Sequence, residues 1–272
     1  MTTAARPMSR TAIGPLLRDW RTRRRRSQLD LAVEVGMSTR HLSFVETGRS
    51  RPSPELLMTI AEHLDVPLRE RNGLLLAAGY APRYSQHSLD EPELRVVKAS
   101  LQRMLDAQDP FPGVVIDRSW NVVAANAAAG ALTAGMPDHL LGPPLNVYRA
   151  CLHPDGLAAR TRNFDEWGRY LVGQLRRTLA TTADPGLAAL LDEVGAYPNV
   201  AALAVRAETS TDVPELLVPV VLDDGSGGSL SLFTTLTTFG TPRDVTLDEL
   251  AVELFFPADD ETAAVLRARV PS

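Results

Sequence analysis

Residues 27–48 read SQLDLAVEVGMSTRHLSFVETG, and this stretch decides the fold of the first third of the chain. Ser27 and Ser38 are favoured helix N-cap residues, and each precedes a short segment of mixed apolar and polar residues. Gly36 lies between the two segments and adopts without steric cost the positive φ that a tight turn requires. The stretch therefore predicts two short helices, 28–35 and 39–47, in the helix-turn-helix arrangement.

Further short helices are expected on both sides of this pair. Ile13, Leu16, Leu17 and Trp20 recur at the spacing of one helical face, so a helix is predicted from residue 13 to the arginine run 23–26. Two more helices are predicted to begin at Pro54 and Leu68, and Gly79 ends the second of them. Turn-forming residues without periodicity follow at 80–92. The first domain is therefore predicted to be all-α and to span residues 1–82.

The charge of the chain is unevenly distributed. The whole sequence of 272 residues has a net charge of −5, which alone argues against binding to nucleic acid. Residues 1–84, however, hold 14 arginines and 8 acidic residues, a net charge of +6, whereas residues 85–272 carry −11. A basic domain joined to an acidic one is expected when only the first meets phosphate. The alternative is chance clustering around the arginine run 23–26 at a solvated helix end.

The predicted helix 39–47 has the surface that a DNA-reading helix needs. Leu42 and Val45 are expected to point to the core, and the opposite face carries four residues at the i, i+3, i+4, i+7 spacing: Arg40, Ser43, Phe44 and Thr47. A helix in the major groove presents such a stripe to the bases. Arg40 suits a bidentate contact with guanine. Phe44 suits a thymine methyl group, although it is also an ordinary surface or core aromatic.

Three further side chains are predicted to support DNA binding. Arg49 and Arg51 follow helix 39–47 and are expected to contact phosphate, with a solvated loop as the alternative. Gln28 begins the preceding helix, so its side chain is expected either on the phosphate or braced against helix 39–47.

Residues 13–82 resemble the XRE family of helix-turn-helix transcription regulators, which includes Cro and the phage repressors. The matching residues are Leu17-Arg18-x-x-Arg21, Ser27-Gln28-x-x-Leu31-Ala32, Gly36-Met37-Ser38, Leu42-Ser43-x-x-Glu46-x-Gly48 and Pro52-Ser53. The resemblance implies that Thr39, Arg40 and Ser43 read the bases, with Ser38 beside them in the DNA-binding surface. It also implies that Arg21 and Glu46 pair inside the helical bundle, which is a structural role.

The sequence pattern changes after Pro110. Strands are predicted at 112–117, 120–125, 216–222, 229–239 and 250–255, and helices separate the second strand from the third. This order indicates an α+β domain over 110–272 with an antiparallel sheet. Residues 83–109 are predicted to be a linker and connecting helix. The apolar stripe of that helix, from Leu94 to Leu105, is open to three interpretations: linker, dimer seam or cap of the second domain.

Several segments from residue 69 onward resemble the MmyB-like branch of these regulators. The matching stretches are RERNGLLLAAGYAP at 69–82, FPGVVIDRSWNVVAAN at 111–126, NVYR at 146–149, LHP at 152–154, and Trp167. The resemblance implies that the second domain is PAS-like, with a curved antiparallel sheet and helices over one face. It also implies a small-molecule sensor.

The long predicted helix at 164–181 carries a stripe of aromatic and aliphatic residues, which suits a cavity wall or plain core packing. The candidate ligand-binding residues are Trp120, Tyr148, Trp167, Tyr170, Leu171 and Arg176. The expected effector is apolar and elongated, such as a fatty-acyl-like or polyketide-like molecule. One of four arginines, Arg149, Arg160, Arg162 or Arg176, is expected to meet a carboxylate of that effector, with surface solvation as the alternative.

Catalytic and metal chemistry find little support in the sequence. Cys151 and His153 lack a third orienting group, and the five histidines show no ligand spacing. No glycine-rich phosphate loop is found. We therefore expect no enzymatic activity, no cofactor and no metal.

The sequence also indicates the cellular compartment in which the protein is expected. The chain has a single cysteine, no apolar run long enough to span a membrane, and no apolar signal region at residue 1 onward. A cytoplasmic protein without a membrane partner is expected.

The sequence therefore predicts a DNA-binding transcription regulator, acting as a homodimer on a double-stranded operator and controlled by a small molecule in the second domain. A regulator whose second domain is only a protein-interaction or dimerisation module is the first alternative. An enzyme fused to a DNA-binding domain is the second. A cavity in the second domain favours the sensor, a filled core with an exposed apolar patch favours the interaction module, and a polar cleft favours the enzyme.

Overall fold

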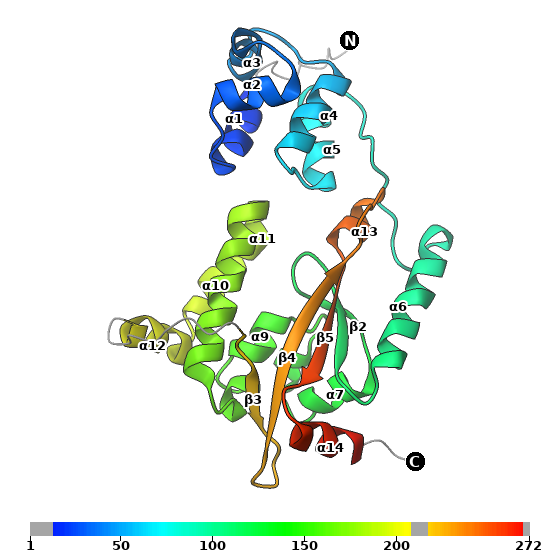
Figure 1. Ribbon diagram of the computed structural model, residues 1–272, viewed down its shortest axis with the longest axis vertical. Helices are drawn as coiled ribbons and strands as arrows, with labels where there is room; N and C mark the ends of the chain where they lie inside the picture. The colour runs from blue at the N-terminus through cyan, green and yellow to red at the C-terminus, as the bar shows by residue number, and fades with distance from the viewer. Residues whose placement is uncertain (1–12, 208–216, 269–272) are drawn as a thin grey trace, which may run out of the picture. The chain divides into compact units, whose positions relative to one another are not determined.

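The computed structural model describes residues 13–207 and 217–268, which form two compact units (Figure 1). The first unit runs to Gln86 and also takes in Pro242–Asp248 from near the end of the chain. The second unit contains His87–Thr241 and resumes at Glu249. No helix in these described ranges is long and apolar enough to cross a membrane.

Up to Ala77, the described part of the first unit is a bundle of five short helices, as predicted. Their bounds are α1 Ile13–Arg23, α2 Gln28–Val35, α3 Thr39–Glu46, α4 Pro54–His63 and α5 Leu68–Ala77. Ser27 caps α2 through a capping box with Asp30, and Gly36 ends α2 at φ 74°. The predicted turn chemistry therefore sets the angle between α2 and α3.

Close packing between α1 and α3 depends on a glycine. A Cβ at Gly14 would collide with the backbone carbonyl of Glu46, so only glycine lets the two helices approach this closely. Leu17, Leu42 and Val45 fill the adjoining core and are almost fully buried. The position of α3 is thus fixed by backbone contact as well as by side chains.

The second unit is built on a five-stranded antiparallel sheet in the order β2-β1-β5-β4-β3. The strands are β1 Gly113–Ile116, β2 Val122–Ala125, β3 Val220–Asp223, β4 Ser229–Thr238 and β5 Ala251–Pro257. This arrangement confirms the predicted α+β fold with an antiparallel sheet. The predicted strand 216–222 begins at a residue outside the described ranges, and its described part is strand only from Val220.

Helices complete the second unit. The larger ones are α6 Arg95–Gln108, α7 Ala127–Thr133, α9 Val147–Leu152, α10 Phe164–Thr182, α11 Pro185–Gly195, α12 Pro198–Ala207 and α14 Asp260–Ala268. The shorter ones are η1 Pro92–Leu94, α8 Asp138–Leu141 and η2 Leu157–Arg160. A further short helix, α13 Val245–Glu249, belongs to the first unit except for its last residue. The sequence did not predict α8, η2, α12 or α13.

The two faces of the sheet are covered by different helices. The helix α6 packs against β1 and buries Leu101 and Leu105, and Gln108 Nε2 donates to the Phe255 carbonyl at 2.8 Å. The predicted stripe of α6 therefore caps the second domain, one of the three interpretations left open. Figure 1 shows α9 and α10 on the other side of the sheet. The main core of the unit, and its cavity, lie between them and that second face.

Trp120 lies in a turn and not in a strand, contrary to the prediction of a strand over 120–125. The Asp117 carboxylate accepts hydrogen bonds from the backbone N–H groups of Ser119 and Asn121, at 2.8 and 2.9 Å. This turn holds Trp120 at φ 63°, a conformation that bulky residues rarely adopt. The tight turn places the buried indole against the core of the second unit.

Candidate functional site

The recognition face predicted on α3 is present in the first unit. Leu42 and Val45 are fully buried, whereas Arg40 and Thr47 are exposed and Phe44 is half-buried. The guanidinium of Arg40 lies 5.3 Å from the Phe44 ring centroid, and that of Arg49 lies 5.8 Å from it. Phe44 therefore joins the two arginines into one basic and aromatic surface, and the stacking pre-orients both cations.

A buried ion pair holds α3 against α1. Arg21 donates to Glu46 from Nε at 2.6 Å and from Nη2 at 3.0 Å, and the Glu46 side chain is 2% exposed. Glu46, chiefly through its hydrogen bond, raises the pKa of Arg21. Gln28 Nε2 donates to the same carboxylate at 2.7 Å. The predicted Arg21–Glu46 pair is thus confirmed, and Gln28 is braced against α3.

The remaining predicted DNA-contacting residues have defined positions. Ser38 caps α3 by accepting from the His41 N–H at 3.2 Å, and Thr39 and Ser43 are half-buried on α3. Arg51 donates to the Gly79 carbonyl at 3.1 Å and lies 4.2 Å from the Tyr80 ring centroid. Arg51 is therefore tied to the end of α5 while remaining exposed. The DNA contacts themselves stay predictions.

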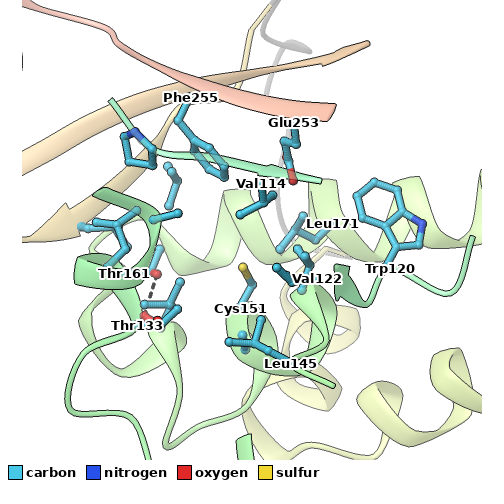
Figure 2. Close-up of a pocket in the computed structure, with 18 of the residues that line it drawn as sticks. Val114, Trp120, Val122, Thr133, Leu145, Cys151, Thr161, Leu171, Glu253 and Phe255 are labelled. Carbon is cyan, nitrogen blue, oxygen red and sulfur yellow. Dashed lines mark hydrogen bonds between the residues drawn. The ribbon is translucent and has the colours of Figure 1, made fainter. Parts of the chain in front are cut away.

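A mainly apolar cavity of about 80 Å³ lies inside the second unit (Figure 2). Its walls come from the sheet, from the Trp120 turn and from four helices. Among the described residues that line it are Val114, Trp120, Ala129, Cys151, Trp167, Leu171, Leu222, Glu253 and Phe255. A cavity of this kind favours the sensor interpretation of the second domain.

The structure divides the predicted ligand-binding residues into two groups. Trp120, Trp167 and Leu171 line the cavity. Tyr148 is fully buried with its ring centroid 4.8 Å from that of Trp120, and Tyr170 stacks on Trp167 at 5.1 Å. These two tyrosines support the wall from behind. Arg176 lies away from the cavity, in a groove formed by α10, α11 and α12.

The other arginines proposed as carboxylate partners are engaged elsewhere. Arg149 pairs with Glu193 at 2.7 Å, and Arg162 pairs with Asp223 at 3.1 Å. Arg160 donates to the Leu132 carbonyl. None of the four arginines belongs to the described lining of the cavity.

The sequence interpretation missed Glu253, the charged residue of the cavity wall. Glu253 is 8% exposed, and its Oε2 atom is buried without a hydrogen-bond partner. It lies directly opposite Val114 in the β1–β5 pair, so both side chains share the face toward the cavity. Burial raises the pKa of Glu253 to about 7, and a hydrogen bond with Thr234 opposes that effect. The sequence did contain a signal for this residue. In the strand AVELFFP, Glu253 is the one acidic residue and lies two positions before Phe255, so strand alternation places both side chains on the same face of the sheet.

Two more polar side chains lie at the cavity, Cys151 in its wall and Tyr148 behind the wall. The Tyr148 hydroxyl has no hydrogen-bond partner, and burial raises its pKa well above the ordinary range. Burial also raises the pKa of Cys151 to about 12. The Cys151 thiol is therefore protonated at neutral pH, which argues against a nucleophilic role.

Among the described residues, two clusters have residue types that suit a metal ion. In the first, His87, Glu91 and Glu93, the Glu91 carboxylate already accepts from the Ser88 N–H at 3.0 Å. The second consists of His139, His153 and Asp155. The ligand atoms of His139, His153 and Asp155 lie within 4.8 Å of one another, although the sequence showed no ligand spacing. His153 Nδ1 already accepts from the Asp155 N–H at 3.1 Å, and its ring packs edge-on against Tyr197. His139 and Asp155 are exposed to solvent. These contacts explain the second cluster without an ion.

Comparisons with known proteins identify both units. A family model described as the MmyB-like transcription regulator ligand binding domain matches residues 97–268, and a helix-turn-helix model matches residues 17–71. The crystal structure of the clp gene regulator ClgR from C. glutamicum is 30% identical, with a TM-score of 0.24 over 28% of this chain and 95% of that one. No curated protein matches the chain. The chain belongs to the MmyB-like transcription regulators, and it is a DNA-binding regulator with an N-terminal helix-turn-helix domain.

Proposed function

We propose that a mainly apolar small molecule binds in the cavity of the second unit and controls the affinity of the regulator for DNA. The observation that carries this proposal is the cavity itself, which is lined by apolar side chains from the sheet and four helices. The curled antiparallel sheet with helices over its cavity face supports a PAS-like sensor. An elongated fatty-acyl-like or polyketide-like effector requires the cavity to widen, because pockets for drug-sized ligands measure about 300–1,000 Å³.

The same cavity weighs against the other two functions. A second domain that serves only as an interaction module would be expected to fill its core. An enzyme would be expected to gather several polar groups around a reacting atom. Here one carboxyl stands in an apolar wall, and the nearby thiol is held protonated. We therefore propose a regulator without enzymatic activity.

The connection between β4 and β5 offers a route for control. Residues Pro242–Asp248 belong to the first unit, although the strands on either side of them belong to the second. Val245 N–H donates to the Ser85 carbonyl at 2.8 Å, and Asp248 Oδ2 accepts from the Leu68 N–H at 2.9 Å. Asp248 thereby caps α5, whose own N-cap residue, Pro67, provides no side-chain cap.

Cavity residues lead directly to this connection. Glu253 and Phe255 line the cavity from β5, and β5 begins three residues after Asp248. Arg118, in the Trp120 turn, pairs with Glu249 at 3.0 Å, and Glu249 is the next residue after Asp248. A ligand that moves β5 or the Trp120 turn would therefore act on the cap of α5. Control requires that the ligand bind the two DNA-affinity states unequally.

The experiment that tests the proposed function starts from the purified full chain. Native mass spectrometry and solvent extraction are expected to find a co-purifying small molecule, and the extract is expected to change DNA affinity. Ala129→Leu places a larger side chain in the cavity wall and should abolish that response while DNA binding persists. A chain that carries no molecule, is stabilised by no lipid or metabolite panel and responds to no extract would favour the interaction module.

The route itself gives a prediction with a matched pair of variants. Asp248→Ala removes the acceptor for the Leu68 N–H, so we expect the effect of the extract on DNA affinity to fall severalfold while ligand binding persists. Asp248→Asn keeps an acceptor and should preserve the response. Fluorescence anisotropy on labelled operator DNA, with and without the extract, measures both. Equal responses in the two variants would contradict the route.

The recognition face gives a second prediction. Arg40→Ala is expected to weaken binding to the preferred site by about 1–3 kcal/mol and to relax sequence preference. Arg49→Ala should weaken all DNA sequences alike and reduce the log–log salt slope by about 1. Anisotropy titrations on specific and random duplexes at several salt concentrations separate the two effects. Equal losses on both duplexes for Arg40→Ala would contradict the assignment of α3 to base recognition.

We also propose that the regulator acts as a homodimer on two half-sites about one helical turn apart. One helix-turn-helix buries little DNA surface for tight specific binding. The side chains of Leu101 and Leu105 on α6 are buried within their own unit. The dimer interface is therefore expected on the exposed side of α6, which carries Val96, or elsewhere on the acidic second domain. Light scattering is expected to give the mass of two chains, free and on DNA. A single-chain mass in both states would contradict the dimer.

A further inference from the structure

We propose that the effector carries a cationic hydrogen-bond donor, an amine, which pairs with the Glu253 carboxylate inside the cavity. This inference rests on the proposed function and names the class of its ligand. It replaces the expectation of a ligand carboxylate held by an arginine. Figure 2 shows the end of the Glu253 side chain directed from β5 toward Leu171 and Val122 on the other walls.

The geometry leaves one strong acceptor unsatisfied at this place. Glu253 Oε2 is buried without a hydrogen-bond partner, and the residue opposite Glu253 on β1 is the apolar Val114. Burying an unpaired carboxylate costs more than burying almost any other group, whereas a carboxylate paired with a cation regains much of that cost. The cavity therefore favours a ligand that brings the missing donor, because the pairing lowers the cost of keeping Glu253 ionised in the wall.

The polar groups around Glu253 do not provide a site for an anion. Cys151 and Tyr148 face it from α9, Thr234 hydrogen-bonds to it from β4, and Thr161 donates to the Leu157 carbonyl at 2.8 Å. Among charged groups on the packed helices, Arg177 of α10 acts on Tyr148 and is exposed at the surface. Above pH 7, where Glu253 is ionised, an anionic ligand would meet its charge without a described basic residue in the lining to offset it.

The size of the cavity narrows the ligand further. About 80 Å³ is less than the roughly 150 Å³ of an engineered protein cavity that binds benzene. The apolar part of the ligand that fits with the least rearrangement is therefore a single ring or a short chain. The aromatic walls, Trp120 and Trp167, also suit an amine-bearing ring.

Three matched probes test the amine class on the full chain: 2-phenylethylamine, 2-phenylethanol and 3-phenylpropanoate. By isothermal titration calorimetry at pH 8, we expect the amine to bind at least about tenfold more tightly than the alcohol, and the carboxylate to bind most weakly. Glu253→Gln keeps the shape of the side chain and removes its charge. It should weaken the amine about tenfold or more and change the alcohol by less than about threefold. Retained alcohol binding also shows that the variant folds.

The pH profile provides an independent readout. The amine needs the ionised carboxylate, so its affinity should fall by up to about tenfold for each pH unit below 7 in the unsubstituted chain, and should stay flat in Glu253→Gln. Three results would overturn the amine assignment: 3-phenylpropanoate binds most tightly of the probes, the amine binds equally to the unsubstituted chain and to Glu253→Gln, or no probe binds. The proposed function fails by a different result, which is the lack of any DNA response to the extracted ligand.

Discussion

Replacing Glu46 by alanine is expected to destabilise the first unit by about 3–5 kcal/mol, the largest effect of any single substitution considered for that unit. The Glu46 carboxylate accepts three hydrogen bonds, two from Arg21 and one from Gln28, and its side chain is 2% exposed. Alanine would leave the Arg21 guanidinium, which is 12% exposed, without its counter-charge. The loss of an ion-pair partner is costly because the remaining charge stays buried.

An exposed ion pair in the same unit provides the control. Arg23 Nε lies 2.8 Å from Asp19 Oδ2, a similar distance, but these side chains are 37% and 56% exposed. Asp19→Ala should therefore cost no more than about 0.5 kcal/mol. Hydrogen exchange of the full chain, followed on peptides from α1 to α4, reports the first unit separately from the second. Similar losses of protection in the two variants would contradict a buried structural role for the Arg21–Glu46 pair.

The first unit was largely predictable because its signals are local. Ser27, Gly36 and Ser38 act within a few residues of themselves, and the structure contains the caps and the turn that they predict. The buried residues of α3 were predictable from helical periodicity for the same reason. The requirement for glycine at position 14 was not, because it arises from the backbone of Glu46, which is distant in sequence.

The second unit was predictable in its class and less so in its site. The order of strands and helices predicted an antiparallel sheet, and the stripe on α10 predicted buried Trp167 and Leu171. Which arginines approach the cavity depends on long-range pairing, such as Arg149 with Glu193, and no local pattern encodes that. The position of Pro242–Asp248 in the first unit could not be predicted either. It depends on contacts with Leu68 and Ser85, which are more than 150 residues away in the chain.

Glu253→Gln is expected to stabilise the ligand-free chain increasingly as the pH rises. Burial raises the pKa of Glu253 from 4.5 to about 7 in the folded chain, while the unfolded chain keeps the ordinary value. The folded state thus holds its proton more tightly, and the associated stability is fully present below pH 4.5 and is lost as the pH rises through 7. Since a tenfold change in proton affinity is worth about 1.4 kcal/mol, the loss approaches about 3 kcal/mol above pH 8.

Glutamine cannot ionise, so the substituted chain escapes this loss. Urea unfolding of both chains between pH 4 and pH 9, followed by tryptophan fluorescence, should give a difference in unfolding free energy that is constant at low pH and grows between about 4.5 and 7. Taking the difference between the chains cancels the other titrating groups. Thr234→Val removes the hydrogen bond that favours the ionised form, so it should raise the pKa of Glu253. The pH at which the difference stops growing should then lie above 7. A difference independent of pH would mean that water reaches the Glu253 carboxylate in solution. The cavity would then lack the buried charge that selects a cationic ligand.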